Sequence, residues 1–477
     1  MKKAFISNIV FLILANLLIK PFYLFGIERK VQILVGNYDF GNYYNLFNFT
    51  LILQFINDFG IQNYTSRTIS QATQDVELKA RQLLQIKLGL SFIYLVLSLG
   101  IALLWYGEEV DIKFILHLCI NQILISLIFF LRSNIAGLGL YFADSIFSIL
   151  DRALLIIFMV GFCFVPSLQS QVSIPLFVNV QTISLLICTI SAWIVLVKYK
   201  FSFKFQFLSR KRAIEILRFC LPFAMIYFAT ALFLKADTIW IENIFENGKE
   251  EAGRYAMCFR LYDAMTIVSL SFGGLLLAMF SKLYGDEKNL YELLQTSLTY
   301  LFIITIGLAF TGIFYAKEIN QLFNKSSDTE LEQIIMYLSI AFIPGSLNYI
   351  FGAFYQATHR ELRLLLFYSV SAVVSILLNY LLLPELGIKA SAIVFILVQS
   401  LLLVLSTVFL KSEFIHFRQR LEKIVFFTAG LLIAYSVLYF FINLPYGIEW
   451  GIIITLAMVL MNVLKIFNWK EIKKFRP

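Results

Sequence analysis

Four ionisable side chains lie within two apolar stretches near the middle of the sequence. Lys235 and Asp237 close one stretch, and Arg260 and Asp263 lie inside the next. A charge near the bilayer centre costs roughly 2.5–3.5 kcal/mol, so a membrane helix that keeps one usually directs it toward protein or water. We therefore expect a polar cavity here. The structural alternative is that all four groups simply pair between the two helices.

The first half of the chain carries further charges of this kind. Lys20 follows Asn16 by four residues, so both lie on one face of a helix, and Lys20 either snorkels to the outer headgroups or faces a lumen. Arg152 sits beside a polar stripe, and structural pairing or cavity lining explains it equally well. The stripe consists of residues at helical spacing, Tyr141, Asp144, Ser148 and Asp151.

A third set of polar residues interrupts the apolar run at 42–61. It consists of Asn45, Asn48, Gln54, Asn57 and Asp58. Hydrocarbon offers these groups no hydrogen-bond partner, so the run should line an interior surface. Asp58 either pairs with Arg67 at the cytoplasmic mouth or takes part in ion coupling or charge balance.

Composition places these residues in a polytopic membrane protein. The chain has 477 residues, of which 60% are hydrophobic and 14% charged, and its mean hydropathy is +0.81. A soluble core of this size could not hide so much apolar surface. The net charge of +9 falls in short loops between apolar runs, which argues against nucleic acid as a partner.

Runs of about 20 apolar residues predict the membrane spans. We expect an all-α protein with about fourteen of them, at 6–26, 42–61, 82–105, 114–131, 146–166, 174–197, 216–241, 257–281, 294–315, 331–355, 364–383, 390–410, 424–443 and 448–466. Lys and Arg concentrate in alternate loops, so both termini should be cytoplasmic. The first run lacks a cleavage site and is interpreted as an uncleaved helix.

Motifs for catalysis are missing from the sequence. There is no phosphate-binding loop, the three histidines are dispersed, and the five cysteines are scattered through apolar runs without metal or redox spacing. We therefore expect neither an enzyme, nor a metal site, nor a cofactor.

A motif that recurs just before the second predicted helix of each half indicates that the chain consists of two similar halves. Phe40-Gly41-Asn42-Tyr43 in the first half matches Ala252-Gly253-Arg254-Tyr255 in the second. We expect two parallel six-helix lobes around a central cavity. The expected parts are an N-terminal lobe at 1–197, a basic cytoplasmic linker at 198–215, a C-terminal lobe at 216–410, and two more helices with a basic tail at 411–477.

Four motifs in this order resemble the polysaccharide branch of the MOP exporter superfamily, which includes the O-antigen flippases. They are Asp58-Phe-Gly60 leading to Ser66-Arg67, Leu221-Pro222-Phe223 with Lys235-Ala-Asp237, Gly253-Arg-Tyr255 with Arg260 and Asp263, and Leu378-Asn379-Tyr380 leading through Pro384 and Gly387 to Ala390. The resemblance covers about the first 410 residues. Lys389 departs from the small residue that is common in relatives.

The resemblance implies a flippase that moves an undecaprenyl-diphosphate-linked oligosaccharide across the bacterial inner membrane by alternating access, for O-antigen, lipopolysaccharide, capsule or exopolysaccharide synthesis. The phosphates would need cations, for which the candidates are Lys20, Arg152, Lys235 and Arg260. Asp58, Asp151, Asp237 and Asp263 would balance them or couple transport to protons or sodium ions. A monomer surrounded by membrane lipids is expected, with a polysaccharide polymerase as a candidate partner.

Two other functions stay open. A cation-coupled multidrug or small-molecule antiporter of the same superfamily would favour a compact cavity centred on carboxylates. A membrane-bound transferase or polymerase would be expected to have a large external loop, whereas the external loops here are short.

Overall fold

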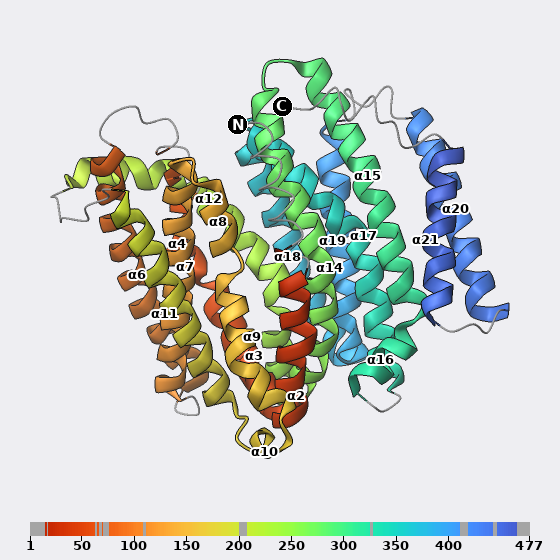
Figure 1. Cartoon of the computed structure of the whole chain (residues 1–477), viewed down its shortest axis with the longest axis horizontal. Coiled ribbons are helices and arrows are strands. Elements are labelled where there is room, and N and C mark those ends of the chain that lie inside the picture. The colour runs from red at the N-terminus through yellow and green to blue at the C-terminus, as the bar shows by residue number, and fades with distance from the viewer. Residues whose placement is uncertain are drawn as a thin grey trace. The chain divides into compact units, whose positions relative to one another are not determined.

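The structure, a computed structural model, consists of helices throughout the part of the chain that it describes (Figure 1). The described residues are 15, 16, 18–62, 64, 65, 69, 76–107, 111–199, 208–324, 328–410, 418–441 and 446–464. The expected all-α class is confirmed. The chain divides into two compact units, Met1–Met257 and Cys258–Pro477, and the boundary falls inside one helix, α14 (Gly248–Lys282).

The first unit contains a π-helical segment and a series of helices that continues to the start of α14. After the segment Phe22–Glu28 come α2 (Arg29–Val35), α3 (Asn37–Ile52), α4 (Gln54–Asp58), α6 (Val76–Tyr106), α7 (Ile112–Gly137), α8 (Tyr141–Phe147), α9 (Leu150–Phe164), α10 (Pro166–Gln169), α11 (Ile174–Lys198), α12 (Arg210–Lys235) and α13 (Asp237–Ile244). The π-helical segment directly follows Pro21, which lacks the N–H needed for a regular helical ladder.

The second unit continues from α14 with seven further helices among the described residues. They are α15 (Glu287–Phe314), α16 (Ala316–Asn324), α17 (Thr329–Ala357), α18 (Glu361–Leu386), α19 (Lys389–Val408), α20 (Arg418–Phe441) and α21 (Tyr446–Val463). In Figure 1, α17 lies beside α15 and α19, and the final pair α20 and α21 packs along α15. Tyr435 of α20 fixes this pair by donating a hydrogen bond to the Gly307 carbonyl at 3.0 Å.

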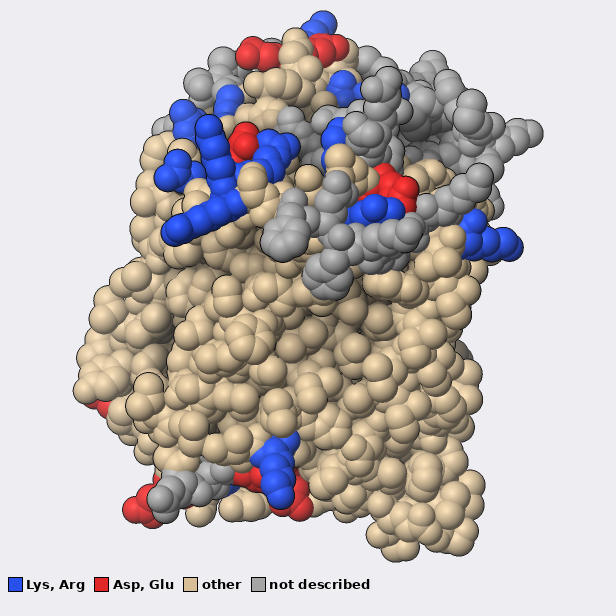
Figure 2. Space-filling view, turned by 90° about the vertical axis from the view of Figure 1, so that its left-hand side faces the viewer, with Lys and Arg blue, Asp and Glu red and all other residues tan. Residues whose placement is uncertain are grey.

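Ten of the described helices are long and apolar enough to cross a membrane. On the face shown in Figure 2, charged side chains gather at the two ends and a broad band between them carries almost none. All fourteen predicted runs are helical where they are described, but the count of fourteen spans is not established. Residues 6–14 lie outside the described part, run 42–61 is broken, and Lys423–Tyr439 and Ile448–Val463 are shorter apolar helices.

Three of the predicted runs are divided by breaks that apolar periodicity did not reveal. Run 42–61 breaks at Leu53 between α3 and α4, run 146–166 breaks between α8 and α9, and run 216–241 breaks at Ala236 between α12 and α13. The end of run 42–61 is irregular as well, and α12 approaches it closely. After α4, Gly60 adopts a φ of 76°, and a Cβ there would lie 2.9 Å from the Cys220 carbonyl oxygen of α12.

Aspartates start several helices at the ends of the membrane-length segments. Asp111 accepts hydrogen bonds from the backbone of Lys113 and Phe114 at 2.9 and 3.4 Å, which satisfies N–H groups that α7 leaves unpaired.

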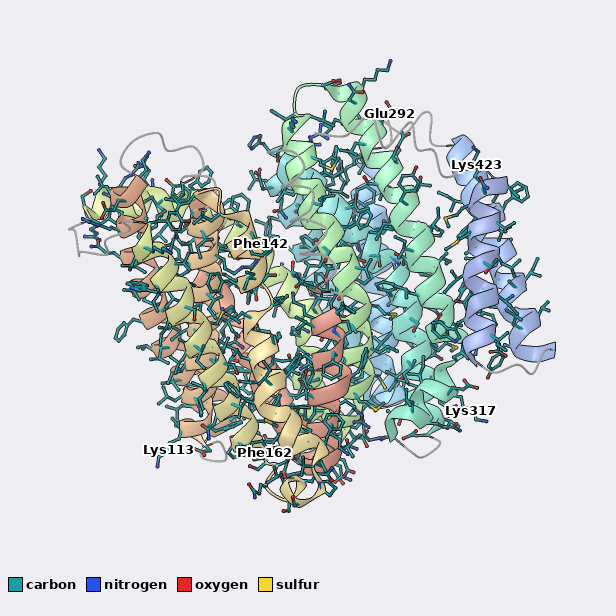
Figure 3. All side chains as sticks on the ribbon, viewed as in Figure 1. Lys113, Phe142, Phe162, Glu292, Lys317 and Lys423 are labelled. Atoms are coloured by element: carbon teal, nitrogen blue, oxygen red, sulfur yellow. The ribbon has the colours of Figure 1, made fainter. Side chains whose placement is uncertain are left out.

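Within the second unit, Glu292 and Lys423 lie at one end and Lys317 at the other (Figure 3). All three lie near the starts of their helices.

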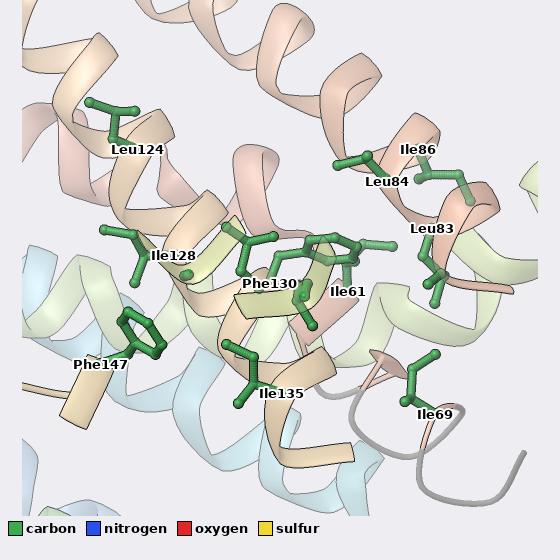
Figure 4. Packing of buried hydrophobic residues seen from close by; sticks show 14 of the residues in the cluster. Ile61, Ile69, Leu83, Leu84, Ile86, Leu124, Ile128, Phe130, Ile135 and Phe147 are labelled. Atoms are coloured by element: carbon green, nitrogen blue, oxygen red, sulfur yellow. The ribbon is translucent and has the colours of Figure 1, made fainter. Parts of the chain in front are cut away.

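The core of the first unit is built from aliphatic side chains of α6 and α7 together with the chain that follows α4. Figure 4 shows Leu83 and Leu84 of α6, Phe130 and Ile135 of α7, and Ile61 between them. Because this cluster is apolar and buried, it fixes the mutual position of the helices that carry the polar residues described below.

The two glycine motifs that suggested a repeat lie against each other inside the first unit. A Cβ on Gly41 would overlap the Lys249 carbonyl and lie 2.7 Å from Gly253 N, and a Cβ on Gly253 would overlap the Asn37 carbonyl. The contact is reciprocal, because Asn37 precedes Gly41 by four residues just as Lys249 precedes Gly253. Gln32 reinforces it by donating a hydrogen bond to the Gly253 carbonyl at 2.9 Å. The two backbones can approach this closely only because neither glycine has a side chain.

Gly41→Ala should therefore destabilise the protein, by about 1–3 kcal/mol for an overpacked site. The change places a methyl group against the backbone of α14, which cannot move aside as a flexible side chain would. The midpoint of thermal unfolding of the purified protein measures the effect. Gly89→Ala in α6 is the matched control, because nothing lies within 4 Å of its Cβ position. Equal midpoints for the two variants would contradict the close approach.

Candidate functional site

A cluster of charged side chains in the first unit brings together three of the predicted site residues. The Arg152 guanidinium of α9 lies 4.6 Å from the centroid of the Tyr23 ring, and its Nε lies 3.5 Å from Asp151 Oδ2. The charges of Arg152, Asp151 and Arg132 all act on Lys20. We call Lys20, Arg132, Asp151 and Arg152 the cationic cluster.

Helix irregularities position the cationic cluster. Lys20 directly precedes Pro21 and the π-helical segment, and Arg152 lies in the first turn of α9, just after the break that separates α8 from α9. Asn16 ties the chain before Pro21 to this break by donating a hydrogen bond to Ser148 Oγ at 3.1 Å. The predicted face shared by Asn16 and Lys20 therefore points at the polar stripe of the fifth predicted run.

Carboxylates nearly balance the cations of the cluster. Arg132 Nε of α7 lies 2.8 Å from Asp144 Oδ1, so Arg132 neutralises Asp144, and Arg152 is paired with its neighbour Asp151. Glu28, which is buried, adds a further negative charge near Arg152. Because the Arg152 side chain is 29% exposed and its guanidinium carbon lies over the Tyr23 ring, its other N–H groups can meet an anion that competes with Asp151.

Asp58 has a partner that the sequence interpretation missed. Lys87 Nζ of α6 lies 3.9 Å from Asp58 Oδ1, and the Lys87 side chain is fully buried. Arg67, the partner considered from the sequence, lies outside the described residues. The sequence does contain an indication of this partner. Lys87 lies within the apolar run 82–105, and an ionisable residue inside such a run needs a polar environment.

Lys235 and Asp237 are separated by the break at Ala236. Lys235 is the last residue of α12 and is half-buried, whereas Asp237 opens α13 and is buried, with Oδ2 accepting a hydrogen bond from the Tyr255 hydroxyl at 2.9 Å. Both residues belong to the first unit.

Arg260 and Asp263 belong to the second unit and lie on one face of α14. Arg260 Nη1 lies 3.2 Å from Asp263 Oδ2, as their spacing of three residues predicts. The roles of Lys235 and Arg260 as cations for an anionic substrate stay predictions, as does pairing of all four groups between the two helices.

The amides of α3 and α4 face protein, as predicted. Asn45, Asn48, Gln54 and Asn57 are at most 5% exposed. Asn45 donates a hydrogen bond to the Tyr106 hydroxyl at 3.1 Å, and Asn48 donates one to Thr238 Oγ1 of α13 at 3.0 Å. The second predicted run therefore serves as an interior surface of the first unit.

Glu242 of α13 lies just beyond the predicted run 216–241. Its Oε2 is buried without a hydrogen-bond partner among the described residues. Burial raises the pKa of Glu242 from 4.5 to about 7. The positive charge of Lys249 acts in the other direction and lowers this pKa, but its effect is smaller. A carboxyl with a higher pKa in the folded than in the unfolded protein stabilises the fold below about pH 4.5, and this contribution is lost as the pH rises to about 7.

Glu242→Gln should therefore leave the unfolding midpoint unchanged near pH 4.5 and raise it above that of the wild type at pH 7.5. The amide imitates the protonated acid but cannot ionise. Thermal unfolding of the purified protein at both pH values measures the change. Glu246→Gln, at an exposed position, serves as the control and should not alter the pH dependence. A variant that follows the wild type at both pH values would refute the assignment.

Two protein-family models match this chain. The family model described as polysaccharide biosynthesis protein matches residues 5–284, which is more than half of the chain, and the MatE model matches residues 212–381. The first match includes both the cationic cluster and Asp58. No curated protein matches the chain.

Several solved membrane transporters share the fold. The lipid II flippase MurJ in an inward closed conformation superposes with a TM-score of 0.62 at 14% identity, over 97% of this chain and 97% of that chain. An inward-facing multidrug resistance MATE family transporter gives a TM-score of 0.63 at 14% identity, over 86% and 98% of the two chains. A MOP superfamily transporter from Pyrococcus furiosus gives 0.61 at 14% identity, over 87% and 96%.

Proposed function

This chain belongs to the polysaccharide biosynthesis protein family, in the polysaccharide transporter branch of the MOP superfamily, and on this basis we propose that it is a lipid-linked oligosaccharide flippase. Its substrate would be a polyprenyl-diphosphate-linked repeat unit, moved by alternating access from the cytoplasmic to the outer face of the bacterial inner membrane. The product would feed synthesis of O-antigen, capsule or exopolysaccharide.

The cationic cluster is the observation that carries the proposal. A lipid-linked glycan presents a diphosphate between an apolar tail and a polar sugar, so its carrier needs cations at membrane depth. Lys20 supplies a compact charge, and Arg152 supplies a planar set of N–H donors suited to phosphate oxygens. Both lie inside residues 5–284, the part of the chain that defines the family.

The carboxylates beside the cations have a role in this proposal. Asp151 holds the Arg152 guanidinium while the site is empty, which avoids an uncompensated buried charge. An arriving diphosphate replaces Asp151 as the partner, and release of the lipid restores the pair. In the same way, Asp58, Asp237 and Asp263 would balance cations or couple transport to protons or sodium ions, and Lys235 and Arg260 would extend the anion path.

A cation-coupled antiporter of drugs or other small molecules is the second candidate. It is favoured by the match of the MatE model to residues 212–381 and by the similarity to MATE structures. In such a protein, Asp58, Asp151, Asp237 and Asp263 would be the principal groups, and loss of Lys20 or Arg152 would matter less.

Arg152→Ala and Lys20→Ala should each block export of the lipid-linked unit. Removing a charged hydrogen bond costs about 1.5–3 kcal/mol, which corresponds to roughly tenfold to hundredfold weaker binding of the diphosphate. A strain that lacks the protein is rescued with each variant at equal membrane abundance. The amount of surface polysaccharide and the sidedness of the accumulated lipid-linked unit are then measured.

Two controls separate charge from folding. Lys113→Ala removes an exposed cation at the opposite end of α7 from Arg132 and should rescue fully. The double variant Asp151→Asn/Arg152→Gln removes both charges of the pair, so a stable but inactive protein would show that the defect at this pair does not come from misfolding. If glycan export persists in the Ala variants while drug efflux falls, the antiporter replaces the flippase.

A further inference from the structure

Lys87 of α6 is a fully buried cation that the proposed transport step does not use. Its ammonium donates hydrogen bonds to the Asn57 carbonyl at 2.7 Å, to Asn57 Oδ1 at 3.3 Å and to Ser126 Oγ of α7. Asp58 Oδ1 lies 3.9 Å away. We call these four oxygen atoms the oxygen cage.

The oxygen cage is held in place by hydrogen bonds that do not involve the Lys87 ammonium. Ser91 Oγ donates to Asn57 Oδ1 at 2.8 Å, and Asn57 Nδ2 donates to the Gln122 carbonyl at 3.2 Å. Gln54 Nε2 also donates to the Gln122 carbonyl, at 3.1 Å. Because α4 and α7 are joined in this way, the cage should survive when the ammonium is removed.

The charge and size of the cage define what it can bind. It contains a single carboxylate, and two of its oxygens come from Asn57 at the carbonyl end of α4, where the helix dipole is negative. One positive charge therefore balances it. The Lys87 ammonium, itself monovalent, lies 2.7 Å from the Asn57 carbonyl and 3.3 Å from Asn57 Oδ1. The cage suits a monovalent cation of about the size of ammonium.

We infer that the oxygen cage is a monovalent-cation site whose occupant, the Lys87 ammonium, is supplied covalently by α6. A tethered occupant cannot be released, so it joins α4, α6 and α7 permanently. This matters because α4 is only five residues long and is followed by Phe59 and Gly60, both with positive φ. The inference concerns the first unit, is independent of the substrate proposed above, and gives Asp58 the charge-balancing role of the two considered for it.

Removal of the ammonium should convert the cage into a site for free cations. Lys87→Met keeps the apolar stem, is one atom shorter and leaves the position of the ammonium vacant. The purified full-length variant is heated in choline chloride, and the choline is then replaced stepwise by potassium or ammonium chloride at constant ionic strength. We expect a lowered midpoint in choline and a saturable rise with potassium or ammonium, whereas the wild type and the exposed-site control Lys113→Met should not respond.

The inference is overturned if the midpoint of Lys87→Met does not depend on the cation, or if the wild type shows the same dependence. A double variant covers the case in which Lys87→Met does not fold. Asp58→Asn alone leaves the ammonium without its carboxylate, and Asp58→Asn/Lys87→Met removes both charges. The double variant should unfold at a higher temperature than Asp58→Asn and show no response to potassium. If Asp58→Asn is as stable as the wild type and the double variant is less stable, the carboxylate does not belong to a cation site.

Discussion

Polar groups that this chain carries to membrane depth must find their partners within the protein, because hydrocarbon offers none. This constraint explains why the amides of α3 and α4 are buried against α7, α13 and Tyr106, and why Lys87 is surrounded by oxygen atoms. It also explains the pairing of Arg152 with Asp151 and of Arg132 with Asp144. A cationic cluster that is balanced in this way can be kept in an apolar unit and still exchange a carboxylate for a phosphate.

Broken helices are the means by which the constraint is met. A continuous helix presents its polar residues along a fixed spiral, whereas the breaks at Leu53, Ile149 and Ala236 let successive segments turn toward different neighbours. At Ala236, this places Asp237 where the Tyr255 hydroxyl reaches it. The reciprocal contact of Gly41 and Gly253 then holds α3 against the start of α14, so the polar face of α3 stays covered.

The sequence was sufficient for those features that depend on composition and local spacing. Apolar runs of membrane length predicted the helices, and the amides of run 42–61 predicted an interior face. Partners from distant helices could not be predicted in this way. The pairing of Asp144 with Arg132, the position of Lys87 beside Asp58 and the contact between the two glycine motifs all depend on tertiary packing. Apolar periodicity also did not reveal the helix breaks or the positive φ of Gly60, which lies beside the Cys220 carbonyl of α12.

The central claim is that this chain moves a lipid-linked oligosaccharide across a bilayer. The most direct test reconstitutes the purified protein into vesicles whose inner leaflet alone contains a polyprenyl-diphosphate oligosaccharide, and measures its exposure to an external lectin over time. The account predicts that exposure rises faster in vesicles with protein than in protein-free vesicles, and that a polyprenyl-linked sugar without the diphosphate is moved much more slowly. Equal exposure with and without the protein, under an imposed proton or sodium gradient as well as without one, would contradict it.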